Sequence, residues 1–179
     1  MRQFIKSLMV VAALAIVTSA SAQLEGTTIS FEPAGKKTAE GLSINKNLVA
    51  YLAFSDEQAS EGTHSLKVTF TPDELEPKGV NFRMGSADKG FTLAKGSHNI
   101  SFKLYRADDN APNFKFVFYG GEKPTAVMVK SASYESGKWV DVSLDFELGF
   151  DFNSTISLVT PKAKYTENSA YYIDQLTIK

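Results

Sequence analysis

The sequence predicts an all-β domain, a two-sheet antiparallel β-sandwich, and three observations lead to this fold class. Apolar and polar residues alternate at period two in one short segment after another. Gly, Pro, Asn or Asp bounds these segments, with a turn signal about every 8 to 15 residues. Helical periodicity is almost absent. Such alternation is typical of antiparallel sheets that have one face on a core and the other in water.

The predicted strands follow one another along the whole chain. In order they are TTISFE (27–32), LVAYLAF (48–54), HSLKVTF (64–70), VNFRMG (80–85), FTLA (91–94), NISFKLY (99–105), NFKFVFY (113–119), TAVMVK (125–130), WVDVSLDF (139–146), TISLV (155–159) and AYYIDQLTIK (170–179). Their inward-facing residues predict this core: Phe31, Leu66, Val68, Phe70, Phe82, Ile100, Phe102, Leu104, Phe114, Phe116, Phe118, Val142, Leu144, Ile156, Leu158 and Ile173. Two segments are candidates for short helices, DEQASEG (56–62) and TPDELEP (71–77).

The N-terminal residues have the features of an export signal. Arg2 and Lys6 precede an apolar stretch from Leu8 to Val17, and Ala20-Ser21-Ala22 forms a small-residue cleavage site. The alternative, a membrane anchor, needs roughly 20 apolar residues to span a bilayer, and this run has about ten. The sequence therefore predicts that residues 1–22 are cleaved. Residues 23–179 would form one mature domain, periplasmic or extracellular, with no transmembrane segment.

Composition excludes several classes of partner and stabilising device. Without Arg2 and Lys6, 17 of the 19 basic residues remain against 20 acidic ones, a net charge of −3. Neither a basic block nor an RNA-binding motif is present, so a nucleic-acid partner is not expected. The chain has no Cys, so disulfides cannot stabilise the exported domain. Its stability must come from a full core or from a bound metal.

Four stretches, in order along the chain, resemble carbohydrate-binding modules that share the galactose-binding-like jelly roll. They are the ISFEPAG opening, SEGTHSLKVTF, SGKWVDVSLDFE and the closing YYIDQLTI. The resemblance implies an exported bacterial jelly-roll domain whose first and last strands are adjacent, and which binds a poly- or oligosaccharide without catalysis. One departure is that KKTAEGLSINKNLVAYLAF lacks the Trp that the family often places after its first strand.

The resemblance also implies a structural calcium ion. Glu32 of the first strand and Asp174 of the last strand match the family's two acidic ligands, and the turn near Thr63 to Ser65 matches the segment that adds carbonyl oxygens. Calcium takes six to eight oxygens at about 2.4 Å. Its charge would offset the cost of placing Asp174 among apolar neighbours. The alternative is that both acids lie at strand edges, solvated or paired with Lys.

No catalytic constellation is visible, so no catalytic residue and no enzyme activity are expected. The sequence has neither a G-x-S-x-G elbow nor an H-E-x-x-H pair. His64 and His98 lie in polar turns before strands and are expected to be exposed. A glycan-active hydrolase or lyase is the weaker alternative. Trp139 is interpreted as a structural residue at the edge of the sandwich rather than as a sugar-stacking platform.

Alternation along the strands predicts a candidate ligand-binding face. The neighbours of inward-facing residues point outward, which selects Asn81, Arg83, Lys103, Tyr105, Lys115 and Tyr119. Aromatic rings beside amides and cations suit a sugar ring and its hydroxyls, and the lysines favour acidic glycans. The alternative is an ordinary solvated sheet face. A second functional class also stays open, an accessory or adhesion domain that binds another secreted or cell-surface protein through an exposed apolar patch.

Overall fold

A computed structural model describes residues 28–29, 31–32, 52–70, 81–84, 91–154, 156–160 and 167–179. For Thr28 and residues 81–84 it describes the backbone only. The predicted export signal (1–22), the candidate helix at 71–77 and part of the predicted strand at 48–54 lie outside the described residues. The division of the chain after Ala22 therefore stays a prediction. None of the helices in the described part of the chain is long and apolar enough to cross a membrane.

The strands pair into two principal sheets, and every pairing is antiparallel. The six-stranded sheet has the order β2-β3-β12-β6-β9, with β1 also paired to β12. Its strands are β1 (Thr28–Ile29), β2 (Leu52–Ser55), β3 (Ser65–Phe70), β6 (Gly96–Arg106), β9 (Trp139–Leu148) and β12 (Ser169–Ile178). The pairing of β1 with β12 confirms that the first and last strands are adjacent.

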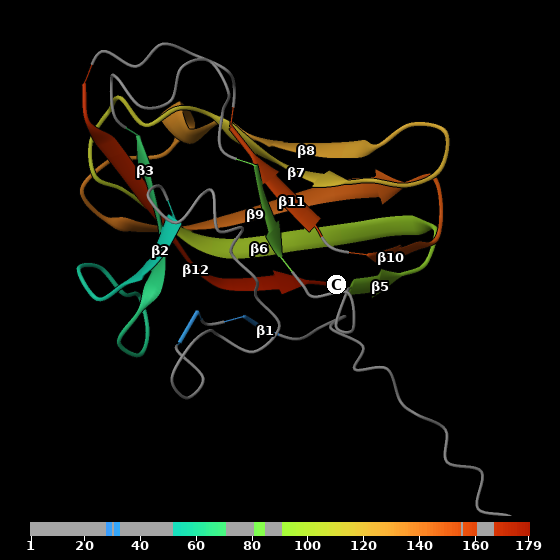
Figure 1. Cartoon of the computed structure of the whole chain (residues 1–179), viewed down its shortest axis with the longest axis horizontal. Helices are drawn as coiled ribbons and strands as arrows, with labels where there is room; N and C mark the ends of the chain where they lie inside the picture. Colours follow the sequence, from blue (N-terminus) through green and yellow to red (C-terminus); the bar gives the residue numbers. More distant parts are fainter. Residues whose placement is uncertain are drawn as a thin grey trace, which may run out of the picture.

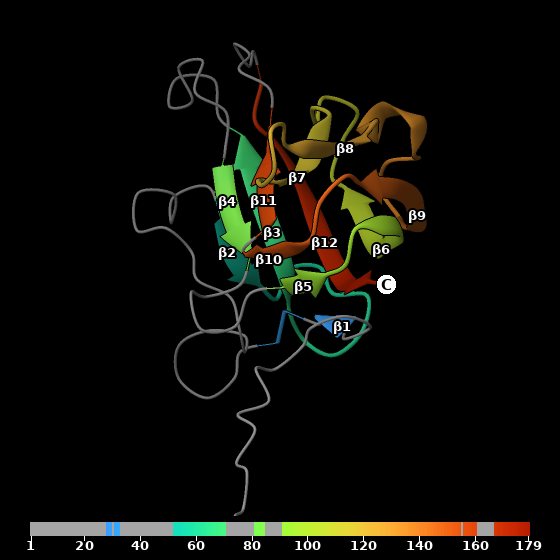
Figure 2. The same ribbon diagram turned by 90° about the vertical axis from the view of Figure 1, so that its right-hand side faces the viewer.

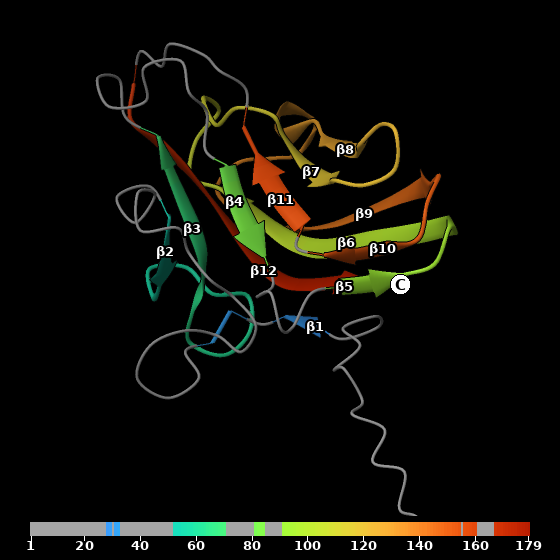
Figure 3. The same ribbon diagram turned by 45° about the vertical axis from the view of Figure 1, so that its right-hand side comes forward.

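The four-stranded sheet has the order β4-β11-β7-β8. Its strands are β4 (Asn81–Met84), β7 (Phe114–Phe118), β8 (Thr125–Val129) and β11 (Ile156–Val159). Figure 1 shows β7 and β8 above β6 and β12, and Figure 2 shows β4 beside β11 from the side. A short pair, β5 (Phe91–Leu93) with β10 (Phe152–Ser154), lies near the end of β12 (Figure 3).

The core lies between the two principal sheets and is rich in aromatic contacts. Phe102 of β6 meets Phe116 of β7 with ring centroids 5.4 Å apart. Phe114 stacks on Tyr171 of β12 at 4.7 Å, and Phe118 stacks on Phe146 of β9 at 4.8 Å. Each of these contacts joins one sheet to the other. The predicted all-β, two-sheet antiparallel sandwich is confirmed.

Most of the predicted core residues are buried, with two qualifications. Leu144 is only partly buried at the margin of the core, and the side chain of Phe82 lies outside the described part. The alternation missed the buried residues of the short pair, Phe91, Leu93 and Phe152. It also missed most of β12, which is buried on both faces and therefore shows no alternation.

The segment at residues 56–62 forms bends rather than the short helix that was considered. Its backbone N–H groups are used in other ways: Glu57 donates to the Ser55 hydroxyl, while Ser60 and Glu61 donate to the carboxylate of Asp174. One local and two long-range hydrogen bonds thus take the place of helical ones. Within the described residues the helical structure is a single 3₁₀ turn, Ser131–Ser133.

Candidate functional site

Two half-buried aromatic rings adjoin on the outer face of the six-stranded sheet. Tyr105 of β6 lies directly opposite Trp139 of β9, and their ring centroids are 5.6 Å apart. Both rings point outward because the alternation of β6 and β9 turns Leu104 and Val140 toward the core. Trp139 begins the edge strand of the sheet, as expected for a structural residue, but it is also partly exposed.

The next ring on this face, Tyr172 of β12, holds Tyr105 in place. It meets Tyr105 edge to face at 5.7 Å and is only 4% exposed. Its hydroxyl donates to Glu57 at 2.8 Å, and the Lys67 ammonium lies 5.5 Å from its ring centroid. Burial, and then the hydrogen bond to Glu57, raise the pKa of Tyr172, so its hydroxyl stays protonated. Tyr172 therefore supports the aromatic pair and is not itself an accessible surface.

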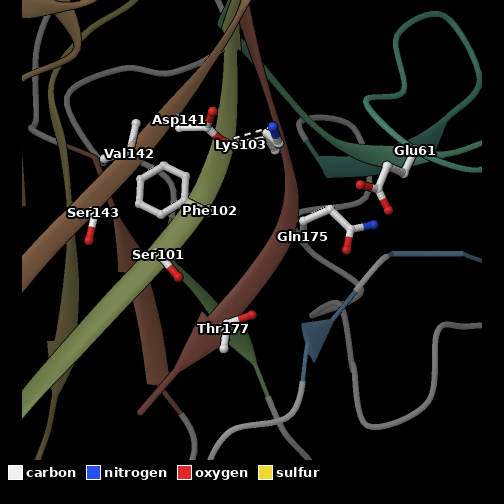
Figure 4. Close-up of a pocket in the computed structure, with 9 residues that line it drawn as sticks. All are labelled: Glu61, Ser101, Phe102, Lys103, Asp141, Val142, Ser143, Gln175 and Thr177. Atoms are coloured by element: carbon white, nitrogen blue, oxygen red, sulfur yellow. Dashed lines mark ion pairs between the residues drawn. The ribbon is translucent and has the colours of Figure 1, made fainter.

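A pocket of about 280 Å³, drawn with its lining residues in Figure 4, lies on the same face. Lys103 and Asp141, which line it, are two residues along β6 and β9 from Tyr105 and Trp139. Its lining is mostly polar and consists of Glu61, Ser101, Lys103, Asp141, Ser143, Gln175 and Thr177, with Phe102 and Val142. An aromatic pair and a hydroxyl-rich pocket thus form one continuous surface along two neighbouring strands.

The cation at this pocket is already paired. Lys103 Nζ donates to Asp141 Oδ1 at 2.8 Å, and this hydrogen bond raises the pKa of Lys103. The more distant carboxylates of Glu61 and Asp174 raise it further. Two carboxylates, of Glu61 and Asp141, line the pocket with this one ammonium group, so this face does not offer the positive field that the lysines of the sequence suggested. On this face, the structure gives no support to the prediction that the lysines favour acidic glycans.

A bulge in β12 forms one wall of the pocket. The pairing of β12 with β6 shifts register between Asp174 and Thr177, and Gln175 within the bulge has φ = 52°. This left-handed conformation is uncommon for a residue other than Gly. The Gln175 N–H donates to Asp174 Oδ1 at 2.8 Å. Figure 4 shows the Gln175 side chain at the pocket, opposite Lys103 and near Glu61.

Glu32 and Asp174, the two acids singled out in the sequence, both bind the turn at residues 60–64. Asp174 is fully buried, and its Oδ2 accepts from the Ser60 N–H at 3.0 Å, the Ser60 hydroxyl at 2.8 Å and the Glu61 N–H at 3.3 Å. Glu32 Oε1 accepts from the N–H groups of Thr63 at 2.7 Å and His64 at 2.8 Å. Asp174 of the last strand and Glu32, three residues after the end of β1, therefore hold the same turn in place.

The sequence of the turn suits these contacts. Gly62 has φ = 66°, and a Cβ at that position would collide with Glu32 Oε1. Hydrogen bonds from the backbone of His64 and then of Thr63 lower the pKa of Glu32, so Glu32 stays ionised at a more acidic pH than a free glutamate. No three His, Asp or Glu side chains in the described ranges cluster as a metal site. Any metal here needs backbone or hydroxyl oxygens in addition to the two acids.

The six predicted ligand-binding residues are divided between the two sheets. Lys103 and Tyr105 lie together on β6, beside the pocket and in the aromatic pair. Those in the four-stranded sheet are Asn81 and Arg83 on β4, Lys115 on β7, and Tyr119 just after β7. The two sheets turn their outer faces in opposite directions, so the structure does not bring all six onto one surface. Their role in binding stays a prediction.

Sequence reasoning missed most of the pocket. The alternation of WVDVSLDF does place Trp139, Asp141 and Ser143 on one face, but the pairing of β9 with β6 cannot be read from it. The bulge at Gln175 carries no recognisable signal either. His98 was expected to be exposed and is instead buried, with its ring nitrogens on the carbonyls of Ala94 and Lys179.

Comparison with known proteins identifies the fold. No protein-family model and no curated protein matches the chain. Among solved structures, the CBM22-1 xylan-binding domain of Paenibacillus barcinonensis Xyn10C superposes with a TM-score of 0.52 and 20% identity, over 88% of this chain and 97% of that one. A xylan-binding domain from CBM 22 gives 0.51 and 13%, over 84% and 91%.

The N-terminal CBM22-1–GH10 modules of Clostridium thermocellum endo-1,4-β-D-xylanase 10B, complexed with xylohexaose, give a TM-score of 0.54 and 18% identity. The match covers 87% of this chain but 28% of that longer protein. At these identities the likeness concerns the fold. The chain has the β-sandwich, jelly-roll fold of carbohydrate-binding modules, as the sequence resemblance predicted.

Proposed function

We propose that this domain binds a poly- or oligosaccharide without cleaving it, and that the ligand lies on the outer face of the six-stranded sheet. The observation that carries the proposal is the half-buried, outward-facing aromatic pair, Tyr105 and Trp139, next to the polar pocket. A sugar ring has an apolar CH face and a rim of hydroxyls. An aromatic platform suits the first, and placed hydroxyl, amide and carboxylate groups suit the second.

The outer face of the four-stranded sheet offers less to a sugar. Val117 and Ser157, which face outward on β7 and β11, are buried. The exposed large hydrophobic side chains of the described residues are Tyr119 and Met128. Two separate residues do not form the apolar patch of several hundred Å² that a protein partner would use. Glycan binding on the six-stranded face is therefore the function that we favour over a protein-binding role or hydrolysis.

Replacing Trp139 by Ala is expected to weaken glycan binding at least tenfold while the protein stays folded. Stacking of a sugar on an aromatic side chain depends on the ring itself, and loss of about 1.4 kcal/mol corresponds to a tenfold change in Kd. Affinity gel electrophoresis with the mature protein would measure it against xylan, galactan, mannan, mixed-linkage β-glucan and polygalacturonate. Xylan is included because two of the structural neighbours are named as xylan-binding.

The matched control is Tyr119→Ala, which removes an exposed aromatic ring from the other sheet. Tyr119→Ala should retain the wild-type migration shift. Retention by Trp139→Ala together with loss in Tyr119→Ala would move the site to the four-stranded sheet. Failure of the wild-type protein to bind any of the five polysaccharides would contradict the proposed function itself.

We further propose that Glu32 and Asp174 hold one structural calcium ion. Several features support this proposal. Glu32, which follows β1, and Asp174 of β12 both bind one turn, where they accept hydrogen bonds from the hydroxyls of Thr63 and Ser60. Such an all-oxygen set suits calcium. Phe31 and Gln175, each next to one of these acids, are the non-glycine residues with positive φ in the described part of the chain. When bound, calcium would supply positive charge beside the buried Asp174.

Removal of calcium is expected to lower the melting midpoint. An ion that binds only the folded state adds RT ln(1 + [L]/Kd), about 2.7 kcal/mol at a hundredfold excess over Kd. Thermal melting of the mature protein in millimolar calcium and in EGTA measures this difference in midpoint, with metal analysis as the control for occupancy. Identical midpoints with no bound metal would contradict the site. The turn would then be fastened by hydrogen bonds from Ser60, Glu61, Thr63 and His64 alone.

The proposed setting of this function is outside the cytoplasm. The signal-like residues 1–22 support export of the domain to the periplasm or the cell exterior. Polysaccharides are encountered there. N-terminal sequencing of the protein from its host tests this, because export predicts a chain that begins at Gln23.

A further inference from the structure

We infer that Gln175 is a specificity-determining residue, whose side-chain amide forms hydrogen bonds with the hydroxyl groups of a neutral sugar in the pocket beside the aromatic pair. The inference rests on the proposed glycan binding and adds to it a subsite, a residue and a ligand class. It starts from the bulge in β12, where the register with β6 shifts between Asp174 and Thr177. The bulge inserts extra backbone at the wall of a pocket that Gln175 lines.

The backbone of Gln175 is held in an unfavourable conformation. Its φ of 52° lies in the left-handed region, where Gly, Asn and Asp are the usual residues. Such a conformation persists where the surrounding structure enforces it, and it often marks a functional position. Here the carboxylate of Asp174 enforces it by accepting the Gln175 N–H while its other oxygen binds Ser60 and Glu61.

The side chain is placed where a ligand would need it. Gln175 lines the pocket together with Ser101, Ser143 and Thr177, and it lies opposite Lys103 in Figure 4. An amide supplies both a donor and an acceptor, and thus can bind two neighbouring hydroxyls of one sugar ring. The carboxylates of Glu61 and Asp141, which also line the pocket, are acceptors for further hydroxyls.

The charges of the pocket select against acidic sugars. Lys103, the cation among the described lining residues, is bound to Asp141 at 2.8 Å. An acidic sugar would have to break this pair or approach Glu61 and Asp141 with a like charge, which is unfavourable. A neutral sugar needs neither change. The pocket therefore fits a neutral glycan whose chain continues along β6 and β9 onto Tyr105 and Trp139.

Substitution of Gln175 separates this role from a structural one. Gln175→Gly removes the amide and also relieves the left-handed strain, so it should melt at or above the wild-type temperature. Gln175→Ala removes the amide and keeps the strain. Both variants are expected to bind neutral polysaccharide about tenfold more weakly, because one or two hydrogen bonds to the sugar are lost. If Gln175 had a purely structural role, a replacement that stabilises the fold would leave the affinity of the protein for polysaccharide unchanged.

The test uses affinity electrophoresis on xylan, galactan, mannan, mixed-linkage β-glucan and polygalacturonate, with thermal melting of each variant. The control, Met128→Ala, changes an exposed residue of β8 in the other sheet and should match wild type. Weaker binding of a neutral polysaccharide by both Gln175 variants, with Gln175→Gly at least as stable as wild type, supports the inference. Undiminished binding by both, or tighter binding of polygalacturonate than of every neutral polymer, overturns it. Absence of wild-type binding to all five overturns the proposed function, and this inference with it.

Discussion

Replacement of Phe116 by Ala is expected to lower the free energy of unfolding by about 3 to 5 kcal/mol. The Phe116 side chain is fully buried in the four-stranded sheet and meets Phe102 of the opposite sheet at 5.4 Å and Phe114 at 5.7 Å. Its removal loses the transfer free energy of the ring, and it also leaves a cavity lined by other aromatic residues. These neighbours belong to both sheets, so the cavity cannot close without moving one sheet against the other.

Urea denaturation followed by circular dichroism measures this loss as a fall in the midpoint at an unchanged slope. Lys115→Ala, one residue away on the outward face of β7, is the matched control and should stay within about 0.5 kcal/mol of wild type. A loss below about 1 kcal/mol for Phe116→Ala would mean that the contact between the sheets is loose at this point. The sandwich core described here would then be incorrect.

Replacement of Asp174 by Ala or Asn is expected to have the second large effect, a loss of about 3 kcal/mol or more. The buried carboxylate accepts four hydrogen bonds, two from Ser60, one from Glu61 and one from Gln175. Hydrogen bonds to a charged group each contribute roughly 1.5 to 3 kcal/mol. Asn has nearly the same shape but only one acceptor oxygen, and its NH₂ group would face donors. Packing alone therefore cannot rescue this variant.

Denaturation in EGTA gives the loss without any contribution from calcium, and hydrogen exchange shows where it acts. The amide protons of Ser60 and Glu61 should exchange faster in both Asp174 variants, because the turn is released. An Asn variant as stable as wild type would contradict the account, since it would show that the carboxylate and its charge are not needed. Glu122→Gln, at an exposed acid between β7 and β8, is the control for a change of charge alone.

The sequence predicted those parts of the fold in which one face of a strand is exposed to solvent and the other face is buried. NISFKLY is the clearest example, because β6 alternates between buried and half-buried residues along nearly its whole length. In β12, by contrast, this alternation is absent. The strand lies between β3 and β6 and is covered on both faces, so Tyr172 and Asp174 are as buried as Tyr171 and Ile173. Its residues indicate a strand but not which side faces the core.

The candidate site was only partly predictable for a related reason. Asp174 stood out because an acid among apolar residues needs partners, and the structure supplies them from a turn 113 and 114 positions earlier in the chain. The pocket depends on the pairing of β6 with β9 and on a shift of register at Gln175. Both are long-range features of the sheet. Outward alternation alone selected Lys103 and Tyr105 correctly as neighbours, but it also joined them to residues of the opposite sheet.

The most direct test of the central claim is an NMR titration of the ¹⁵N-labelled mature protein with oligosaccharides of whichever polysaccharide it binds. The account predicts that shift changes gather at Ser101, Lys103 and Tyr105 of β6, at the indole N–H of Trp139, and at the side-chain amide of Gln175. Residues of β7 and β11 in the four-stranded sheet should stay unchanged. Shift changes confined to Lys115, Tyr119 and the strands around them, with the Trp139 and Gln175 signals unmoved, would contradict it.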